Sequence, residues 1–206
     1  MQETGSSERW TVRTSDPVLS VNDLKQFLYC PRIVYYHWVM PVHPPATYLM
    51  QRGHHQEERF ERLEPRRVLS RYGFQEATRH FGLEITAESL GLIGKVDLIL
   101  EDAARIAVVE FKATPSRLAE NWKVQLCAYG LLAEQRFQRP CPVGFVMLND
   151  SGELAEVELS DPLREQTFAS LRQARGLVMT QQFPGPTPVR ARCSQCEFRN
   201  FCGDVF

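Results

Sequence analysis

Two charged motifs lie inside segments of this chain that otherwise have the apolar character of buried β-strands. Asp97 ends the sequence Gly-Lys-Val-Asp within the run 91–100, and Glu110 lies in the next run, 106–111, two residues before Lys112. Side chains alternate along a strand, so Glu110 and Lys112 share one face. A hairpin turning at Glu101 and Asp102 brings Asp97 alongside them. Because unpaired charge is costly in apolar surroundings, the fold must provide a site for these side chains.

Two carboxylates and a lysine at one point of a sheet suit metal-dependent cleavage of a phosphodiester. Carboxylate oxygens are the ligands that Mg²⁺ and Mn²⁺ prefer. Such an ion polarises the phosphodiester and lowers the pKa of bound water, while a lysine stabilises charge and orients that water. The same spacing is also compatible with a solvated row of salt bridges along a strand face.

The remaining pattern predicts one mixed α/β domain over 17–206, preceded by a polar segment, 1–16. A helix begins at Ser20 with Asp23 as its capping-box partner and breaks at Cys30-Pro31. Further helices are expected over 48–63, 116–134 and 162–179, and strands over 68–72, 78–85, 91–100, 106–111, 143–148 and 154–159. A proline-rich connector, 184–188, then leads to a cysteine-rich tail, 190–206.

Gln125 and Tyr129 are four residues apart and therefore share one face of the helix expected over 116–134. If that face points toward the sheet, the two side chains can contact a phosphate or a metal-bound water. A core tyrosine beside a surface glutamine satisfies the same spacing.

The cysteines of the tail have the spacing of a ligand set. Cys193, Cys196 and Cys202 form C-x2-C-x5-C, and Cys30 supplies a remote fourth thiol. Cytoplasmic thiols stay reduced, so ligation is expected in place of disulfides, with either tetrahedral zinc or a [4Fe–4S] cluster. A reduced, mobile terminus is the alternative. Cys127 and Cys141 are assigned no function.

Charge and hydropathy limit the expected binding partners and cellular location. The 206 residues carry 24 Lys plus Arg against 25 Asp plus Glu, a formal charge of −1, so binding of nucleic acid requires a local patch. No apolar run reaches the length of about 18 residues that a membrane span needs. Segment 1–16 lacks the pattern of a secretory signal, so a cytoplasmic protein with no membrane partner is expected.

In this order, the motifs resemble the CRISPR-associated exonucleases of the Cas4 family, which are RecB-like nucleases of the PD-(D/E)XK fold with an iron–sulfur cluster. The resemblance spans about 19–202 and rests on the sequence 27–32 around Cys30, on 94–97, on 110–112, on Gln125 with Tyr129, and on the cysteine tail. It implies a restriction-endonuclease-like mixed sheet flanked by helices. In that fold, a cysteine-ligated cluster joins the N-terminal helices to the tail.

The resemblance also implies roles for individual residues. Asp97, Glu110 and the carbonyl of Phe111 would ligate Mn²⁺ or Mg²⁺, and Lys112 would be the catalytic lysine. Gln125 and Tyr129 would complete the catalytic group and line the DNA path. The [4Fe–4S] cluster would be held by the four cysteines Cys30, Cys193, Cys196 and Cys202.

One position departs from the family pattern, which places a metal-binding histidine about four residues after a glycine. Here Gly53 is followed directly by His54 and His55, and the fourth residue on is Glu57. His55 is the predicted ligand, since a neutral imidazole binds metal. His54 or Glu57 could take its place, and a solvent-facing histidine pair is a further interpretation.

The function implied by the resemblance is trimming of PAM-containing single-stranded overhangs of prespacer DNA during CRISPR adaptation. The protein would act with the Cas1–Cas2 integrase, as a separate protein or as the nuclease part of a fusion. Two alternatives are a RecB- or AddB-type repair nuclease and a non-catalytic DNA-binding adaptor with a structural metal site. The predicted phosphate contacts are Arg32, Arg52, Arg66, Arg67 and Arg71.

Overall fold

The computed structural model describes residues 16–45, 64–112, 118–148 and 152–203. The segment 1–15 and the helix predicted over 48–63 lie outside these residues, and so do Arg52, Gly53, His54, His55 and Glu57. None of the helices in the described ranges combines the length and the apolar character that a membrane span requires.

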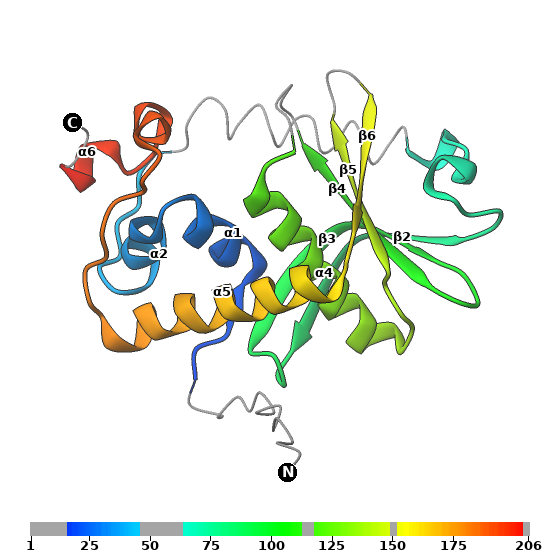
Figure 1. The fold of residues 1–206 in the computed structure, drawn as a ribbon, viewed down its shortest axis with the longest axis horizontal. Helices are drawn as coiled ribbons and strands as arrows, with labels where there is room; N and C mark the ends of the chain where they lie inside the picture. Colours follow the sequence, from blue (N-terminus) through cyan, green and yellow to red (C-terminus); the bar gives the residue numbers. More distant parts are fainter. Residues whose placement is uncertain (1–15, 46–63, 113–117, 149–151, 204–206) are drawn as a thin grey trace, which may run out of the picture.

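A six-stranded mixed sheet forms the centre of the fold (Figure 1). Its order is β1-β3-β4-β5-β6, with β2 paired to β3. The β1–β3 and β4–β5 pairs are parallel and the other pairs are antiparallel. The strands are β1 (Leu19–Ser20), β2 (Thr78–Ala87), β3 (Leu92–Glu101), β4 (Ile106–Lys112), β5 (Val143–Leu148) and β6 (Glu153–Glu158). The predicted α/β class and the hairpin at Glu101-Asp102 are confirmed.

One edge of β3 is shared by two strands. Because β2 pairs with β3 from Leu92 to Glu101, β1 and β4 must both lie along the opposite edge. There β1 pairs with Leu92 and Ile93, whereas β4 pairs from Leu98 to Glu101. Asp97 lies between these two stretches, at the point where β4 separates from β3.

The N-terminal helices begin and end where the sequence indicates. The Ser20 hydroxyl accepts a hydrogen bond from the Asp23 backbone N–H at 2.9 Å, and Asp23 Oδ2 accepts one from the Ser20 N–H at 2.9 Å, which completes the predicted capping box. α1 (Val21–Tyr29) stops before Cys30, whose backbone is extended, and α2 (Pro31–Trp38) starts on a proline. The predicted break is therefore confirmed.

α4 (Glu120–Phe137) covers one face of the sheet, and α1 and α5 (Asp161–Thr180) pack against it. The prediction that this helix begins at Ser116 is wrong, because Ala119 is the N-cap and 118–119 are not helical. Its C-terminal end lies three residues beyond the predicted one, where Gln138 adopts a left-handed conformation (φ 53°). The predicted connector 184–188 has no helix or strand.

The opposite face of the sheet carries a second core, in which the expected strand 68–72 is replaced by a 3₁₀ helix, η2 (Leu69–Tyr72). Gly73 ends it in a left-handed conformation (φ 71°) that favours glycine. Tyr72 packs edge-on against Phe145 and donates a 2.8 Å hydrogen bond to the buried Glu64, in the short helix η1 (Glu64–Arg66). Burial of this ring therefore outweighs the local strand pattern. The tail forms η3 (Arg190–Gln195) and α6 (Arg199–Cys202).

Candidate active site and cysteine cavity

Asp97 and Glu110 meet where the β3–β4 ladder ends. The last pair in its register is Leu98 with Val109, so Asp97 and Glu110 are the next residues along the two strands. Asp97 Oδ2 accepts a 2.8 Å hydrogen bond from the backbone N–H of Phe111. Glu110 is buried, and Asp97 is partly buried. The predicted placement of Asp97 beside the strand that carries Glu110 is confirmed.

Lys112 and Gln125 complete a polar group beneath α4. Lys112 Nζ donates to Glu110 Oε1 at 2.5 Å and to Gln125 Oε1 at 2.9 Å. Gln125 Nε2 donates to Glu110 Oε1 at 3.1 Å and, at 3.5 Å, to the Tyr129 hydroxyl. Gln125 is only 3% exposed, so the surface-glutamine interpretation is wrong. The Glu110 and Lys112 side chains are 9% and 13% exposed, which rules out a solvated salt-bridge row.

The second carboxylate oxygen of Glu110 has the environment of a metal ligand. Glu110 Oε2 is buried and has no hydrogen-bond partner among the described residues. A buried acceptor left in this state is costly, and a divalent cation would satisfy it. Asp97 and Glu110 therefore fit Mg²⁺ or Mn²⁺, ions commonly bound through one or two carboxylates together with water and substrate oxygens.

The described residues provide only part of the predicted ligand set. Among them, no group of three or more His, Cys, Asp or Glu side chains is gathered closely enough to hold one metal ion. The predicted third side chain, His55, and its alternatives His54 and Glu57 lie outside the described residues. The carbonyl of Phe111 remains a prediction.

Trp122 is a neighbour of this site that the sequence reasoning missed. Its ring centroid lies 5.6 Å from Lys112 Nζ, close enough for a cation–π contact. The helical periodicity accounts for Trp122 only as a core position. Its place three residues before Gln125, on the same face of α4, was the available signal.

Gly94 allows α1 and α4 to approach β3 closely. A Cβ atom at this position would lie 2.8 Å from Tyr129 Cε1 and 2.9 Å from Val21 Cγ2. Both distances are below van der Waals contact, so a larger residue would displace Tyr129 or the helix that carries it. The glycine of the Gly-Lys-Val-Asp motif therefore has a packing role next to Tyr129, which contacts the polar group around Gln125.

We expect Gly94→Ala to destabilise the fold by about 1–3 kcal/mol, the usual cost of overpacking, and to reduce cleavage by moving Tyr129 and Gln125. Chemical denaturation and a nuclease assay on the same preparation measure both effects. Gly176→Ala is the matched control, because no neighbouring atom lies within 4 Å of a Cβ at this position in α5. It should leave activity unchanged and stabilise the helix by up to about 1 kcal/mol. Equal stability of parent and Gly94→Ala would contradict the packing role.

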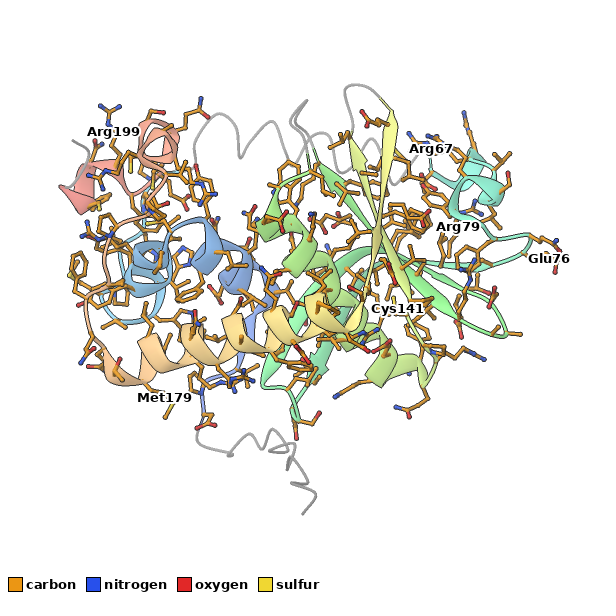
Figure 2. All side chains as sticks on the ribbon, in the orientation of Figure 1. Arg67, Glu76, Arg79, Cys141, Met179 and Arg199 are labelled. Atoms are coloured by element: carbon orange, nitrogen blue, oxygen red, sulfur yellow. The ribbon has the colours of Figure 1, made fainter. Side chains whose placement is uncertain are left out.

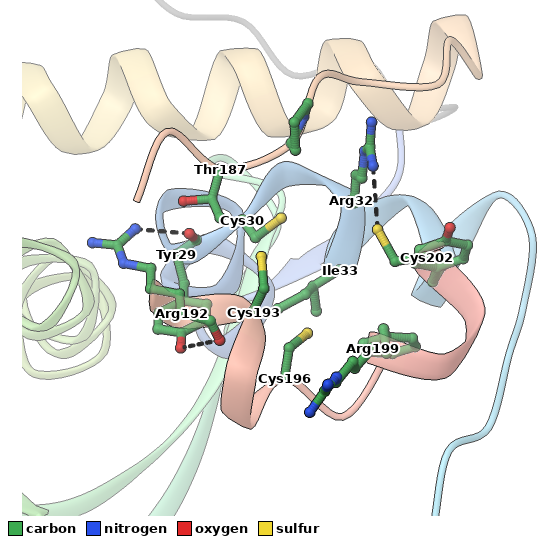
Figure 3. A pocket seen from close by; sticks show the side chains of 13 residues that line it. Tyr29, Cys30, Arg32, Ile33, Thr187, Arg192, Cys193, Cys196, Arg199 and Cys202 are labelled. Atoms are coloured by element: carbon green, nitrogen blue, oxygen red, sulfur yellow. Dashed lines mark hydrogen bonds between the residues drawn. The ribbon is translucent and has the colours of Figure 1, made fainter. Parts of the chain in front are cut away.

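The four predicted ligand cysteines line one cavity between the N-terminal helices and the tail (Figure 3). Cys30 comes from the break between α1 and α2, Cys193 from η3, Cys196 from the residue after it, and Cys202 from α6. Cys30 is buried and the other three are partly buried. The fold thus brings together thiols that are up to 172 residues apart in the chain, from Cys30 to Cys202.

The tail is held against the N-terminal helices by contacts beside the thiols. Arg192 Nη1 donates to the carbonyls of Leu28 and Tyr29 at 3.2 and 2.7 Å, which caps the end of α1. Phe198 stacks on Tyr36 with a centroid distance of 5.4 Å. Burial raises the pKa of the Tyr29 hydroxyl, and the nearby Cys196 raises it further.

The donor set of this cavity fits an iron–sulfur cluster. A four-iron cluster binds each of four thiolates to a different iron, and the four cysteines line one shared cavity. Tetrahedral zinc takes four thiolates as well, so the donor set alone is compatible with either group.

The other two cysteines belong to the core. Cys127 on α4 and Cys141, labelled in Figure 2, are fully buried. Burial raises the pKa of both thiols, that of Cys141 to about 12. Both therefore stay protonated and unreactive at neutral pH.

The predicted phosphate contacts differ in their exposure. Arg66 and Arg71 are exposed. Arg67 is partly buried and pairs with Glu64 at 3.2 Å near η1 and η2 (Figure 2). The expectation for Arg32 is wrong, since Arg32 is 8% exposed and faces the cysteine cavity.

Comparison with known proteins finds similarity over most of the chain. The profile of the PD-(D/E)XK nuclease superfamily matches residues 38–203. The CRISPR-associated exonuclease Cas4 of Francisella tularensis subsp. novicida is 32% identical over 92% of this chain and 96% of its own length. A Cas4/Cas1 fusion of Myxococcus xanthus is 26% identical over 91% of this chain but 32% of its own length. The crystal structure of SSO0001 superposes with a TM-score of 0.56 and 19% identity, covering 95% of this chain and 89% of that one.

Proposed function

Because the chain belongs to the PD-(D/E)XK nuclease superfamily and, within it, to the Cas4 exonucleases, we propose that this DNA nuclease trims PAM-containing single-stranded overhangs of prespacers during CRISPR adaptation. The observation that carries the proposal is the buried group formed by Asp97, Glu110, Lys112 and Gln125, with one carboxylate oxygen unsatisfied. A Mg²⁺ or Mn²⁺ ion held by Asp97 and Glu110 would supply Lewis-acid activation of the scissile phosphate and of the attacking water.

Lys112 contributes a fixed positive charge next to that ion. Its ammonium group is held between Glu110 and Gln125, so it is oriented before substrate arrives. Cleavage of a phosphodiester places additional negative charge on the phosphoryl oxygens in the transition state. A preorganised cation stabilises that charge without reorganisation during the reaction.

Gln125 and Tyr129 act as positioning residues. The Gln125 amide accepts a hydrogen bond from Lys112 through Oε1 and donates one to Glu110 through Nε2. It therefore fixes the position of the Glu110 carboxylate relative to the Lys112 ammonium group. Tyr129 supports the same amide from one turn further along α4. Trp122 packs against the core and lies beside Lys112, where its ring helps to hold the ammonium group in place through a cation–π contact.

The proposed cofactor of the second site is a [4Fe–4S] cluster on Cys30, Cys193, Cys196 and Cys202. The proposed partners are the Cas1–Cas2 integrase and the DNA overhang it holds. The Cas1 part of the proposal is supported by the Myxococcus xanthus relative, in which a sequence similar to this chain is joined to a Cas1 endonuclease.

A trimming assay tests this function. Duplexes with labelled 3′ overhangs of randomised sequence are incubated with the protein and Mn²⁺, with and without Cas1–Cas2. We expect metal-dependent shortening of the overhang, an intact duplex, and a product length and sequence preference that sharpen when the integrase is present. EDTA is the control. Binding without cleavage would favour the adaptor, and degradation that ignores the integrase and continues into the duplex would favour a repair nuclease.

A further inference from the structure

Arg32 is a buried cation in the wall of the cysteine cavity. Its Nη1 donates a 3.2 Å hydrogen bond to Cys202 Sγ, drawn as a dashed line in Figure 3. Its Nε donates to the carbonyl of Pro184 at 3.0 Å, and the guanidinium lies 4.6 Å from the centre of the Phe183 ring. A buried charge is costly unless it is paired, so these contacts fix where the side chain can lie.

The three contacts join parts of the chain that are distant in sequence. Arg32 itself comes from the first turn of α2, Phe183 and Pro184 from the connector after α5, and Cys202 from α6. The planar guanidinium can serve all three at once because its donors point in fixed directions and its face stacks on an aromatic ring. A lysine has neither property.

The other two arginines of the cavity are placed differently. Arg192 donates through Nη1 to the carbonyls of Leu28 and Tyr29 and lies over the Tyr29 ring. Arg199 is exposed, where solvent screens its charge. These two positions therefore provide a comparison for the effect of a charge that is buried against a sulfur.

We propose that Arg32 is a positioning residue for the cluster ligand Cys202, and that its buried charge and N–H···S hydrogen bond raise the reduction potential of the cluster. The inference rests on the proposed [4Fe–4S] cofactor. Hydrogen bonds to ligand sulfurs and local charge are among the factors that set such potentials. One-electron reduction adds negative charge to the cluster and its thiolates, and a fixed cation nearby stabilises that reduced form.

The test is a redox titration of the anaerobically purified, cluster-loaded full chain, followed by visible absorption and electron paramagnetic resonance. We expect Arg32→Gln to shift the equilibrium toward the oxidised form by about tenfold, equal to about 59 mV for one electron. Arg199→Gln removes the same charge from an exposed position of the same cavity and should match the parent. A parental potential in Arg32→Gln would overturn the inference.

A second measurement covers loss of the cluster. If Arg32→Gln is recovered without iron, its thermal unfolding is compared with that of the iron-free parent, and an unchanged transition would support a role confined to holding the ligand. If Arg32→Gln does not fold, Arg32→Lys is used to test the inference, because it keeps the positive charge but lacks the planar set of N–H donors of the guanidinium. Arg32→Lys should then lose iron to a chelator several-fold faster than the parent, and an equal rate would overturn the inference. A parent without iron would instead reject the proposed cofactor.

Discussion

Replacing Lys112 by alanine is expected to reduce Mn²⁺-dependent cleavage of single-stranded DNA by on the order of 100- to 1,000-fold, the range found when one preorganised charge-stabilising group is removed. DNA binding should persist, since phosphate contacts elsewhere supply most of the affinity. Cleavage is measured by the loss of an end-labelled oligonucleotide, and binding by fluorescence anisotropy in Ca²⁺.

Loss of a proposed metal ligand is expected to reduce cleavage as well. Glu110→Gln keeps the shape of the side chain but removes the charge from the unsatisfied, buried oxygen, so cleavage should fall at least as far as in Lys112→Ala. Lys123→Ala is the matched control, because Lys123 lies near the site on α4, the helix that carries Gln125, and its described ion pair is with the exposed Glu120. Normal cleavage by Glu110→Gln and Lys112→Ala would remove the catalytic assignment and leave the adaptor interpretation.

Replacing Cys193 by alanine should remove the bound iron and destabilise the whole protein. The cluster would join Cys30 to Cys193, which closes a loop of more than 160 residues. Cross-linking a loop of about 100 residues is worth about 4–5 kcal/mol in the chain-entropy treatment of the unfolded state, and ligand binding that requires the folded protein adds further stability. The expected result is a large fall in melting temperature together with loss of the visible absorption.

Iron and sulfide analysis and calorimetry of the anaerobically purified variant measure these effects. Cys127→Ala is the control. Cys127, on α4, is buried in the hydrophobic core and does not line the cysteine cavity. The variant protein should therefore lose some packing energy but keep its iron. A Cys193→Ala protein that retains iron and melts with the parent would exclude Cys193 from the ligand set.

The sequence was informative where chemistry and periodicity agreed. Charged residues inside apolar strands predicted that Asp97 lies beside the strand of Glu110 and Lys112, because a hairpin at Glu101-Asp102 brings the two strands together. The spacing was also compatible with a solvated row of salt bridges, which only the burial of Glu110 and Lys112 excludes. The capping box at Ser20 and the proline at position 31 defined the ends of α1 and α2 for local reasons that need no tertiary structure.

Failures occurred where distant contacts decide the local conformation. The strand expected over 68–72 is a 3₁₀ helix because Tyr72 binds the buried Glu64 and packs on Phe145, neither of which local sequence specifies. Arginine is a residue type that commonly contacts phosphate at a protein surface. Arg32 is instead buried by its partners Pro184 and Cys202, which lie 152 and 170 residues away in the sequence. The role of Gly94 depends on helices from two other parts of the chain.

Because β1 pairs with β3, the helix α1 begins directly beside β3 and ends next to Cys30. Its first residue, Val21, follows β1 directly and packs against Gly94, three residues from Asp97, and its last residue adjoins Cys30. Nine helical residues span about 13.5 Å at 1.5 Å per residue. The cavity that contains Cys30 and the strand that contains Asp97 are therefore separated by little more than the length of one short helix, so the packing around both depends on where α1 lies.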